Sequence, residues 1–170
     1  LLESLWDEIE STFDREKDTL VFIGDYIDRG PDSREVVDFI IDLKNKMNVI
    51  CLKGNHEQML LTYHLYNSYK DFYLMNGGSS TVMSYGLVDS DYGKRIDIPP
   101  EHLDFFRGLV PYHETEDYIF VHAGLKLDFL QEVVTRLRLP GVELDAEPVQ
   151  RGGFAATHDP VHVAHEAHHH

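Results

Sequence analysis

Residues 20–30 read LVFIGDYIDRG, an apolar run that ends at a glycine and continues into a charged loop. The four apolar residues, with charge before them and Gly24 after them, are typical of a short buried strand. The loop holds two carboxylates, Asp25 and Asp28, and the guanidinium of Arg29. Carboxylate oxygens suit hard divalent cations, and the planar arginine fork suits phosphate oxygens. The stretch therefore predicts a strand that ends in a loop able to bind metal and phosphate.

Strands and helices alternate along the rest of the chain. Apolar spacing predicts a helix over residues 33–47, a strand over 49–52, a helix over 56–69 and a third strand over 118–121. A strand, a helix and a strand in this order predict a right-handed parallel crossover. We therefore expect an α/β fold with three parallel strands, and in such sheets ligands bind beyond the carboxyl ends of the strands.

Two further loops follow predicted strands and carry side chains that can bind metal. They read GNHE at residues 54–57 and HAG at residues 122–124. Taken singly, Asp25 has an ordinary explanation as a turn former, Asn55 as a helix cap and His122 as a hydrogen-bonded histidine. Three strand ends that all present ligand-type residues favour a metal-centred site instead. Glycines in each loop are expected to let the backbone approach that site closely.

The three motifs resemble those of the calcineurin-like metallophosphoesterases, in particular of the phosphoprotein phosphatase branch. They are G-D-x-x-D-R-G, G-N-H-E and H-A-G, and the resemblance covers about residues 1–126. It is greatest to bacterial and phage-type members, which include serine/threonine phosphatases and symmetrical diadenosine tetraphosphate hydrolases. The resemblance implies a four-layer β-sandwich flanked by helices, incomplete in this chain, and two Mn, Fe or Zn ions bridged by a carboxylate.

The resemblance also implies a set of metal ligands. Asp25 would bridge both ions, and Asn55 and His122 would complete the ligands of the second. Relatives carry two further ligand motifs, an Asp-x-His before the first helix of this chain and a Gly-His-Thr-Pro after H-A-G, and neither string occurs here. The nearest string, at residues 157–160, has the wrong order. We therefore expect at most one well-ligated metal site, and weak or no activity of this chain alone.

A catalytic group is implied in the same way. His56 would be the general acid that protonates the leaving oxygen, with Asp28 as its partner. Arg29 and Asn55 would hold the phosphate. Two cations would acidify a bridging water, neutralise phosphate charge and stabilise an in-line displacement. The implied substrates are phosphorylated proteins, small phosphoesters or dinucleoside polyphosphates, and the alternative is a noncatalytic fragment that binds metal or phosphate weakly.

Several residues near the loops have more than one interpretation. Glu57 is expected to anchor its loop rather than to bind metal. Gly77 and Gly78 either shape a rim near the substrate or form a plain turn. An aromatic run could stack on a nucleobase, although its helical spacing favours packing; it consists of Tyr63, Tyr66, Tyr69, Phe72 and Tyr73. Three histidines outside the loops are expected on the surface or as hydrogen-bonded core residues, namely His64, His102 and His113.

Composition limits the classes of partner. The chain has 15 basic and 30 acidic residues, a formal charge of −15, which opposes binding to nucleic acid and to anionic membranes. An anionic substrate must then be attracted by a local positive centre. No apolar run of about 18 residues and no signal peptide occurs, so no membrane span is expected. A single cysteine, Cys51, is expected to be a buried apolar residue and favours a cytoplasmic location.

Both ends of the chain are unusual for a domain. Helical spacing begins at Leu2 without an initiating methionine, so a preceding segment is expected to be missing. Residues 1–126 contain 30 Lys, Asn, Ile and Tyr, whereas residues 127–170 contain none. We expect a phosphoesterase domain over 1–126 and an atypical tail over 127–170, which a shifted reading frame, a fused sequence or a natural disordered tail would explain. The histidines of the tail are typical of a tag remnant or of biased composition.

Overall fold

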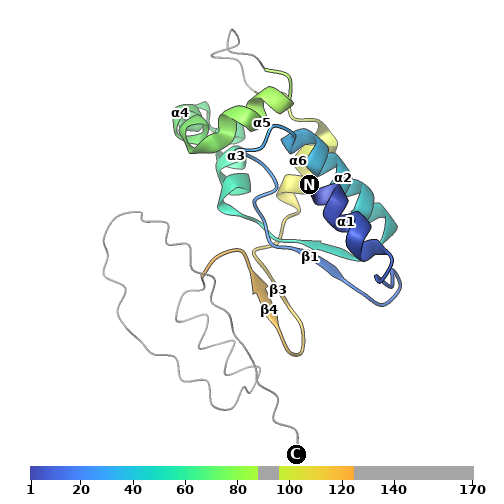
Figure 1. Ribbon diagram of the computed structural model, residues 1–170. Coiled ribbons are helices and arrows are strands. Elements are labelled where there is room, and N and C mark those ends of the chain that lie inside the picture. Colours follow the sequence, from blue (N-terminus) through green and yellow to red (C-terminus); the bar gives the residue numbers. More distant parts are fainter. Residues whose placement is uncertain (88–95, 125–170) are drawn as a thin grey trace, which may run out of the picture.

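The computed structural model describes residues 1–87 and 96–124, shown in colour in Figure 1. The predicted tail, with its histidines and the string at 157–160, lies outside the described residues. The described part combines helices with small sheets, which confirms the predicted α/β class. Within it, no helix has the length and apolar character needed to cross a membrane.

The elements of the described part are short, and most are helical. In chain order they are α1 (Leu2–Glu10), β1 (Leu20–Phe22), α2 (Ser33–Lys46), β2 (Val49–Cys51), α3 (Asn55–Leu65), η1 (Asn67–Tyr69), α4 (Lys70–Tyr73), η2 (Leu74–Gly78), α5 (Ser79–Ser84), α6 (Pro100–Arg107), β3 (Tyr112–Glu114) and β4 (Ile119–Val121).

β1 and β2 form a parallel pair joined by α2, as the sequence predicts. Leu20 lies opposite Val49 in the register of this pair. The segment between the two strands forms the helix α2. Apolar residues recur on one face of this helix, where Val37 and Ile40 are fully buried in the core. A parallel pair brings the carboxyl ends of both strands to the same edge, so the loops that follow β1 and β2 start side by side.

The third predicted strand is present as β4, but its expected parallel pairing is wrong. β4 pairs antiparallel with β3, with His113 opposite Phe120, and among the described residues it makes no ladder with β1 or β2. The reason is a tight turn, in which the Thr115 N–H donates to the Tyr118 carbonyl oxygen at 2.8 Å. This turn places β4 beside β3, the strand that precedes it in the chain. Figure 1 shows this hairpin projecting away from the helical part.

The core lies between the helices and the β1–β2 pair. Its fully buried large side chains include Tyr63, Tyr73 and Phe106, which come from α3, α4 and α6. The helix predicted to extend to residue 69 ends at Leu65, and the chain continues through η1, α4, η2 and α5 at one end of the molecule (Figure 1). Cys51 is buried, as expected, and burial raises the pKa of its thiol to about 11.

Candidate active site

The loops after β1, β2 and β4 meet at one place. His122 Nδ1 donates to the Ile23 carbonyl oxygen at 2.7 Å, which ties the end of β4 to the end of β1. A Cβ on Gly24 would lie 2.7 Å from the Gly54 nitrogen, and a Cβ on Gly54 would lie 2.3 Å from Asp25 Oδ1. Any side chain at either position would separate the loops. The prediction that glycines permit close approach is therefore confirmed for these two loops.

The loop after β1 holds three residues other than glycine in the left-handed backbone region. Asp25, Asp28 and Arg29 have φ values of 58°, 73° and 61°. Such conformations cost free energy and persist where the surrounding structure imposes them, which is common at functional sites. The backbone N–H of each residue is held by a partner: Asp25 by Glu57 Oε2 (3.0 Å), Asp28 by Thr81 Oγ1 (2.8 Å) and Arg29 by the Gly77 carbonyl oxygen (3.1 Å).

Glu57 anchors the first two loops to each other. Its carboxylate is fully buried and accepts backbone N–H donors from Asp25 at 3.0 Å, Tyr26 at 2.7 Å and Gly54 at 2.8 Å. Burial raises the pKa of the Glu57 carboxyl, and the three N–H donors act in the opposite direction. Glu57 is the third residue of α3, where a side chain can turn back to the residue before the helix. Its predicted anchoring role is confirmed.

Asp25, Asn55 and His122, the three predicted metal ligands, lie together. His122 Nε2 is 3.0 Å from Asn55 Oδ1 and 3.3 Å from Asp25 Oδ1. Nδ1 of this ring donates to a carbonyl oxygen, so Nε2 is the ring nitrogen that faces the two oxygen atoms. Carboxylate, amide and imidazole donors suit Mn, Fe or Zn, so these three residues would hold a divalent cation.

These three residues fit one ion. Across residues 1–87 and 96–124, no group of three or more His, Cys, Asp or Glu side chains is placed to hold a metal, so Asn55 is needed to complete the set. Asp25 is 40% exposed and His122 is 19% exposed, which leaves the donors accessible to an incoming ion.

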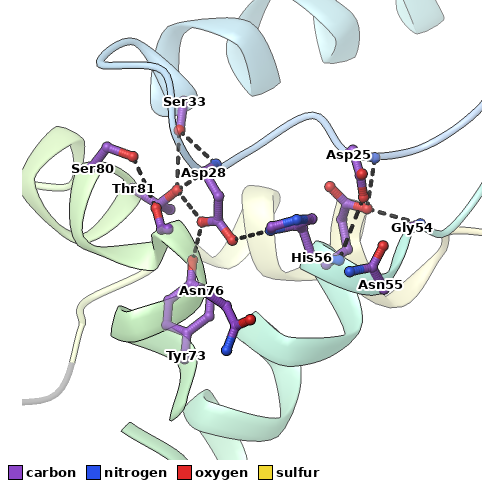
Figure 2. A network of polar contacts seen from close by, with 12 residues as sticks. Asp25, Asp28, Ser33, Gly54, Asn55, His56, Tyr73, Asn76, Ser80 and Thr81 are labelled. Carbon is purple, nitrogen blue, oxygen red and sulfur yellow. Dashed lines mark hydrogen bonds and ion pairs between the residues drawn. The ribbon is translucent and has the colours of Figure 1, made fainter. Parts of the chain in front are cut away.

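His56 and Asp28 form a buried pair beside this donor set (Figure 2). His56 Nδ1 lies 2.7 Å from Asp28 Oδ2, and the side chains are 7% and 0% exposed. The carboxylate can only accept, so Nδ1 carries the proton of this hydrogen bond. His56 Nε2 makes no hydrogen bond to any residue in the described ranges and remains available to a substrate.

The second carboxylate oxygen of Asp28 is also occupied. Asp28 Oδ1 accepts the Tyr73 hydroxyl at 2.7 Å and the Thr81 hydroxyl at 2.6 Å. Burial, with the charge of Asp28, raises the pKa of Tyr73, so this phenol stays a donor. Sequence reasoning missed both contacts, because Tyr73 lies in the aromatic run interpreted as packing. Thr81 lies in α5, a short helix of mostly polar residues, so no local signal in the sequence marked either contact.

Arg29 lies next to the buried pair in the chain and is exposed. In the part of the chain that the structure describes, its guanidinium forms no ion pair, so it is free to bind an anion. Gly77 lies against it, since a Cβ there would lie 3.0 Å from Arg29 Cγ. Gly77 has a φ of 104° and accepts the Arg29 N–H, so it supports the loop after β1 in addition to forming a turn.

Comparison with known proteins identifies the family of the chain. The family model described as calcineurin-like phosphoesterase matches residues 1–170. The chain belongs to the calcineurin-like phosphoesterase family. This membership confirms the resemblance drawn from the three motifs.

Relatives of the chain are named as bis(5'-nucleosyl)-tetraphosphatases, symmetrical or asymmetrical, or as a serine/threonine-protein phosphatase. The chain is 31% identical over 122 residues to a symmetrical bis(5'-nucleosyl)-tetraphosphatase of Coxiella burnetii, covering 66% of this chain and 34% of the relative. It is 34% identical over 115 residues to a protein of the same name from Nitrosospira multiformis, covering 66% and 35%. It is 42% identical over 69 residues to serine/threonine-protein phosphatase 1 of Salmonella typhimurium, covering 41% and 30%. The chain spans about a third of the length of these relatives.

Proposed function

We propose that this chain carries the catalytic loops of a metal-dependent phosphoesterase that hydrolyses phosphate esters, as serine/threonine phosphatases do. The observation that supports this most is the meeting of three loops, with metal donors on one side and the His56–Asp28 pair on the other. The proposed metal ligands are Asp25, Asn55 and His122. Arg29 and Asn55 are proposed to hold the phosphate. The single cysteine supports a cytoplasmic location.

The proposed reaction is a direct displacement by water. The water oxygen loses a proton to solvent as it attacks phosphorus, the bond from phosphorus to the ester oxygen breaks, and His56 Nε2 gives its proton to that oxygen. The alcohol and phosphate leave, and His56 regains a proton from solvent. Asp28 holds the imidazole through Nδ1, so Nε2 points away from the buried carboxylate. Arg29 offers a planar pair of donors to the phosphate oxygens. When bound, Mn, Fe or Zn ions neutralise phosphate charge and lower the pKa of the attacking water.

The test is Mn²⁺-dependent phosphate release from phenyl phosphate, whose leaving oxygen needs protonation, by the 170-residue chain. The proposal expects slow release that a chelator stops, and His56→Ala should reduce the rate by about 100-fold or more because a general acid is lost. His64→Ala, a change of the same kind on the same helix but outside the loops, should leave the rate unchanged. An unaffected rate in His56→Ala would overturn the assignment of His56.

A second candidate function is symmetrical hydrolysis of diadenosine tetraphosphate. The names of the Coxiella and Nitrosospira relatives favour it. In this reaction water attacks one of the inner phosphorus atoms, so both products are ADP. Comparing the rates for diadenosine tetraphosphate and for a phosphoserine peptide separates the two candidates. No release from any substrate, with Mn²⁺ still bound, would favour the alternative of a noncatalytic fragment.

A further inference from the structure

The Asp28 carboxylate is held by more groups than its pairing with His56 requires. Oδ2 receives the imidazole Nδ1 at 2.7 Å, and Oδ1 receives two hydroxyls, from Tyr73 at 2.7 Å and Thr81 at 2.6 Å. Thr81 Oγ1 also accepts the Asp28 backbone N–H at 2.8 Å and lies 3.0 Å from Ser33 Oγ. Figure 2 shows Asp28 at the centre of this network. Every oxygen of the carboxylate thus has a fixed partner.

The two hydroxyls come from elements outside the three sequence motifs. Tyr73 ends α4, and Thr81 lies in α5. Both side chains are fully buried, and the Tyr73 ring stacks on Tyr63 with centroids 5.5 Å apart and planes at 20°. Gly78 completes the enclosure, because a Cβ there would lie 2.5 Å from the Tyr73 ring. Packing therefore sets the positions of the two hydroxyls.

A carboxylate held at one oxygen can rotate about its Cβ–Cγ bond and carry the imidazole with it. Donors on the second oxygen remove that freedom, and a general acid needs its donor atom within hydrogen-bond reach of the leaving oxygen. We propose that Tyr73 and Thr81 are positioning residues, which fix the Asp28 carboxylate so that His56 presents Nε2 to the leaving oxygen. This inference rests on the proposed function.

The leaving group separates positioning from general loss of structure. Protonation matters little when the leaving oxygen is already a weak base, as in para-nitrophenyl phosphate, and much more for phenyl phosphate. Tyr73→Phe should lower kcat on the order of tenfold for phenyl phosphate and about twofold for para-nitrophenyl phosphate, with KM unchanged. Equal losses on both substrates would overturn the proposal.

Tyr63→Phe is the matched control. Tyr63 is as buried as Tyr73 and stacks on it, but its hydroxyl accepts the Ile96 backbone N–H at 3.3 Å and does not contact Asp28. It should leave the ratio of the two rates unchanged. If Tyr73→Phe does not fold, Thr81→Val tests the same carboxylate oxygen, and Thr81→Ser, which keeps the hydroxyl, should restore the ratio.

A double variant tests whether Tyr73 acts through His56. When His56→Asn removes the general acid, Tyr73→Phe should not lower the rate of release from phenyl phosphate any further, because the group that Tyr73 positions is absent. Losses that multiply would contradict the proposal. If His56→Asn itself leaves release unchanged, the proposed function fails. If His56→Asn matters while Tyr73→Phe behaves like Tyr63→Phe, only the positioning role fails.

Proton NMR of the chain gives a measurement that needs no turnover. The proton on His56 Nδ1 is hydrogen-bonded to the buried Asp28 carboxylate and is expected to give a resolved low-field signal, which is absent in His56→Asn. Tyr73→Phe and Thr81→Val should shift or broaden this signal, whereas Tyr63→Phe and Thr81→Ser should not. An unchanged signal in Tyr73→Phe and Thr81→Val would overturn the proposal even if the chain releases no phosphate.

Discussion

Glu57 joins the loops after β1 and β2 through one buried carboxylate. Three backbone N–H groups, from Asp25, Tyr26 and Gly54, have this side chain as their acceptor. Buried N–H groups that lose an acceptor keep the full cost of leaving water. The geometry of the proposed metal donors therefore depends on a residue outside that set.

Glu57→Gln is predicted to destabilise the fold. Glutamine has the same size, but its NH2 group replaces an acceptor oxygen and faces a backbone donor, at a cost of about 1–3 kcal/mol in the free energy of unfolding. Urea denaturation measures this. Glu35→Gln makes the same change at the third residue of α2, on an exposed side chain, and should cost about 0.5 kcal/mol or less. Equal costs in the two variants would contradict the anchoring role.

At the scale of elements, the approach of the loops after β1 and β2 depends on Gly54. Gly54→Ala would place a methyl group 2.3 Å from Asp25 Oδ1 and 2.6 Å from Glu57 Oε2. We expect a loss of about 1–3 kcal/mol in the free energy of unfolding, and weaker Mn²⁺ binding because Asp25 must move. Gly30→Ala is the control, since its nearest contact would be 3.9 Å away. A Gly54→Ala variant as stable as Gly30→Ala would contradict the described loop contact.

α2 and α6 are linked by a second buried histidine. His102 is 3% exposed; its Nε2 lies 2.8 Å from Asp38 Oδ1, and its Nδ1 lies 2.8 Å from the Tyr85 hydroxyl. The expectation of a hydrogen-bonded core histidine is confirmed here. His102→Leu leaves the buried Tyr85 hydroxyl without its partner and should cost about 1–3 kcal/mol. Asp38→Asn should cost about 0–1 kcal/mol, because that side chain is 60% exposed. Thermal unfolding of both variants measures these costs, and a greater loss of stability in Asp38→Asn than in His102→Leu would contradict the prediction.

The sequence predicted those elements whose signal is local. β1, β2 and β4 are short apolar runs, and α2 has a clear apolar face, so their positions follow from neighbouring residues. The partner of β4 could not be predicted, because the choice between β3 and the β1–β2 pair depends on a turn and on contacts distant in sequence. Pairing across long separations leaves no periodic pattern in the strand itself.

The candidate site divides in the same way. Asp25, Asn55, His56 and His122 could be singled out because each follows a strand in a short polar motif. Tyr73 and Thr81 could not, because they reach Asp28 from 45 and 53 residues away in the chain. Their helical setting resembles ordinary packing, and only the fold shows that their hydroxyls meet a carboxylate.

At the scale of the whole molecule, charge supports the proposal that a cation binds at the site. A chain with a formal charge of −15 repels phosphate, and Arg29, which follows Asp28 in the chain, is an exposed positive group. A divalent ion held by Asp25, Asn55 and His122 would reverse the local sign of the field. Inorganic phosphate is therefore expected to bind to the chain only when Mn²⁺ is present, which isothermal titration calorimetry with and without the metal would measure.

The most direct test of the proposed metal site is a measurement of Mn²⁺ binding, in which the electron paramagnetic resonance signal reports the concentration of the free ion. Asp25→Asn and His122→Gln should each weaken Mn²⁺ binding by about tenfold or more, since each removes one donor from a set of three. Asp104→Asn removes the same charge from a side chain that is 80% exposed on α6, and it should change nothing. If all three variants bind Mn²⁺ as the unaltered chain does, the three loops do not form a metal site.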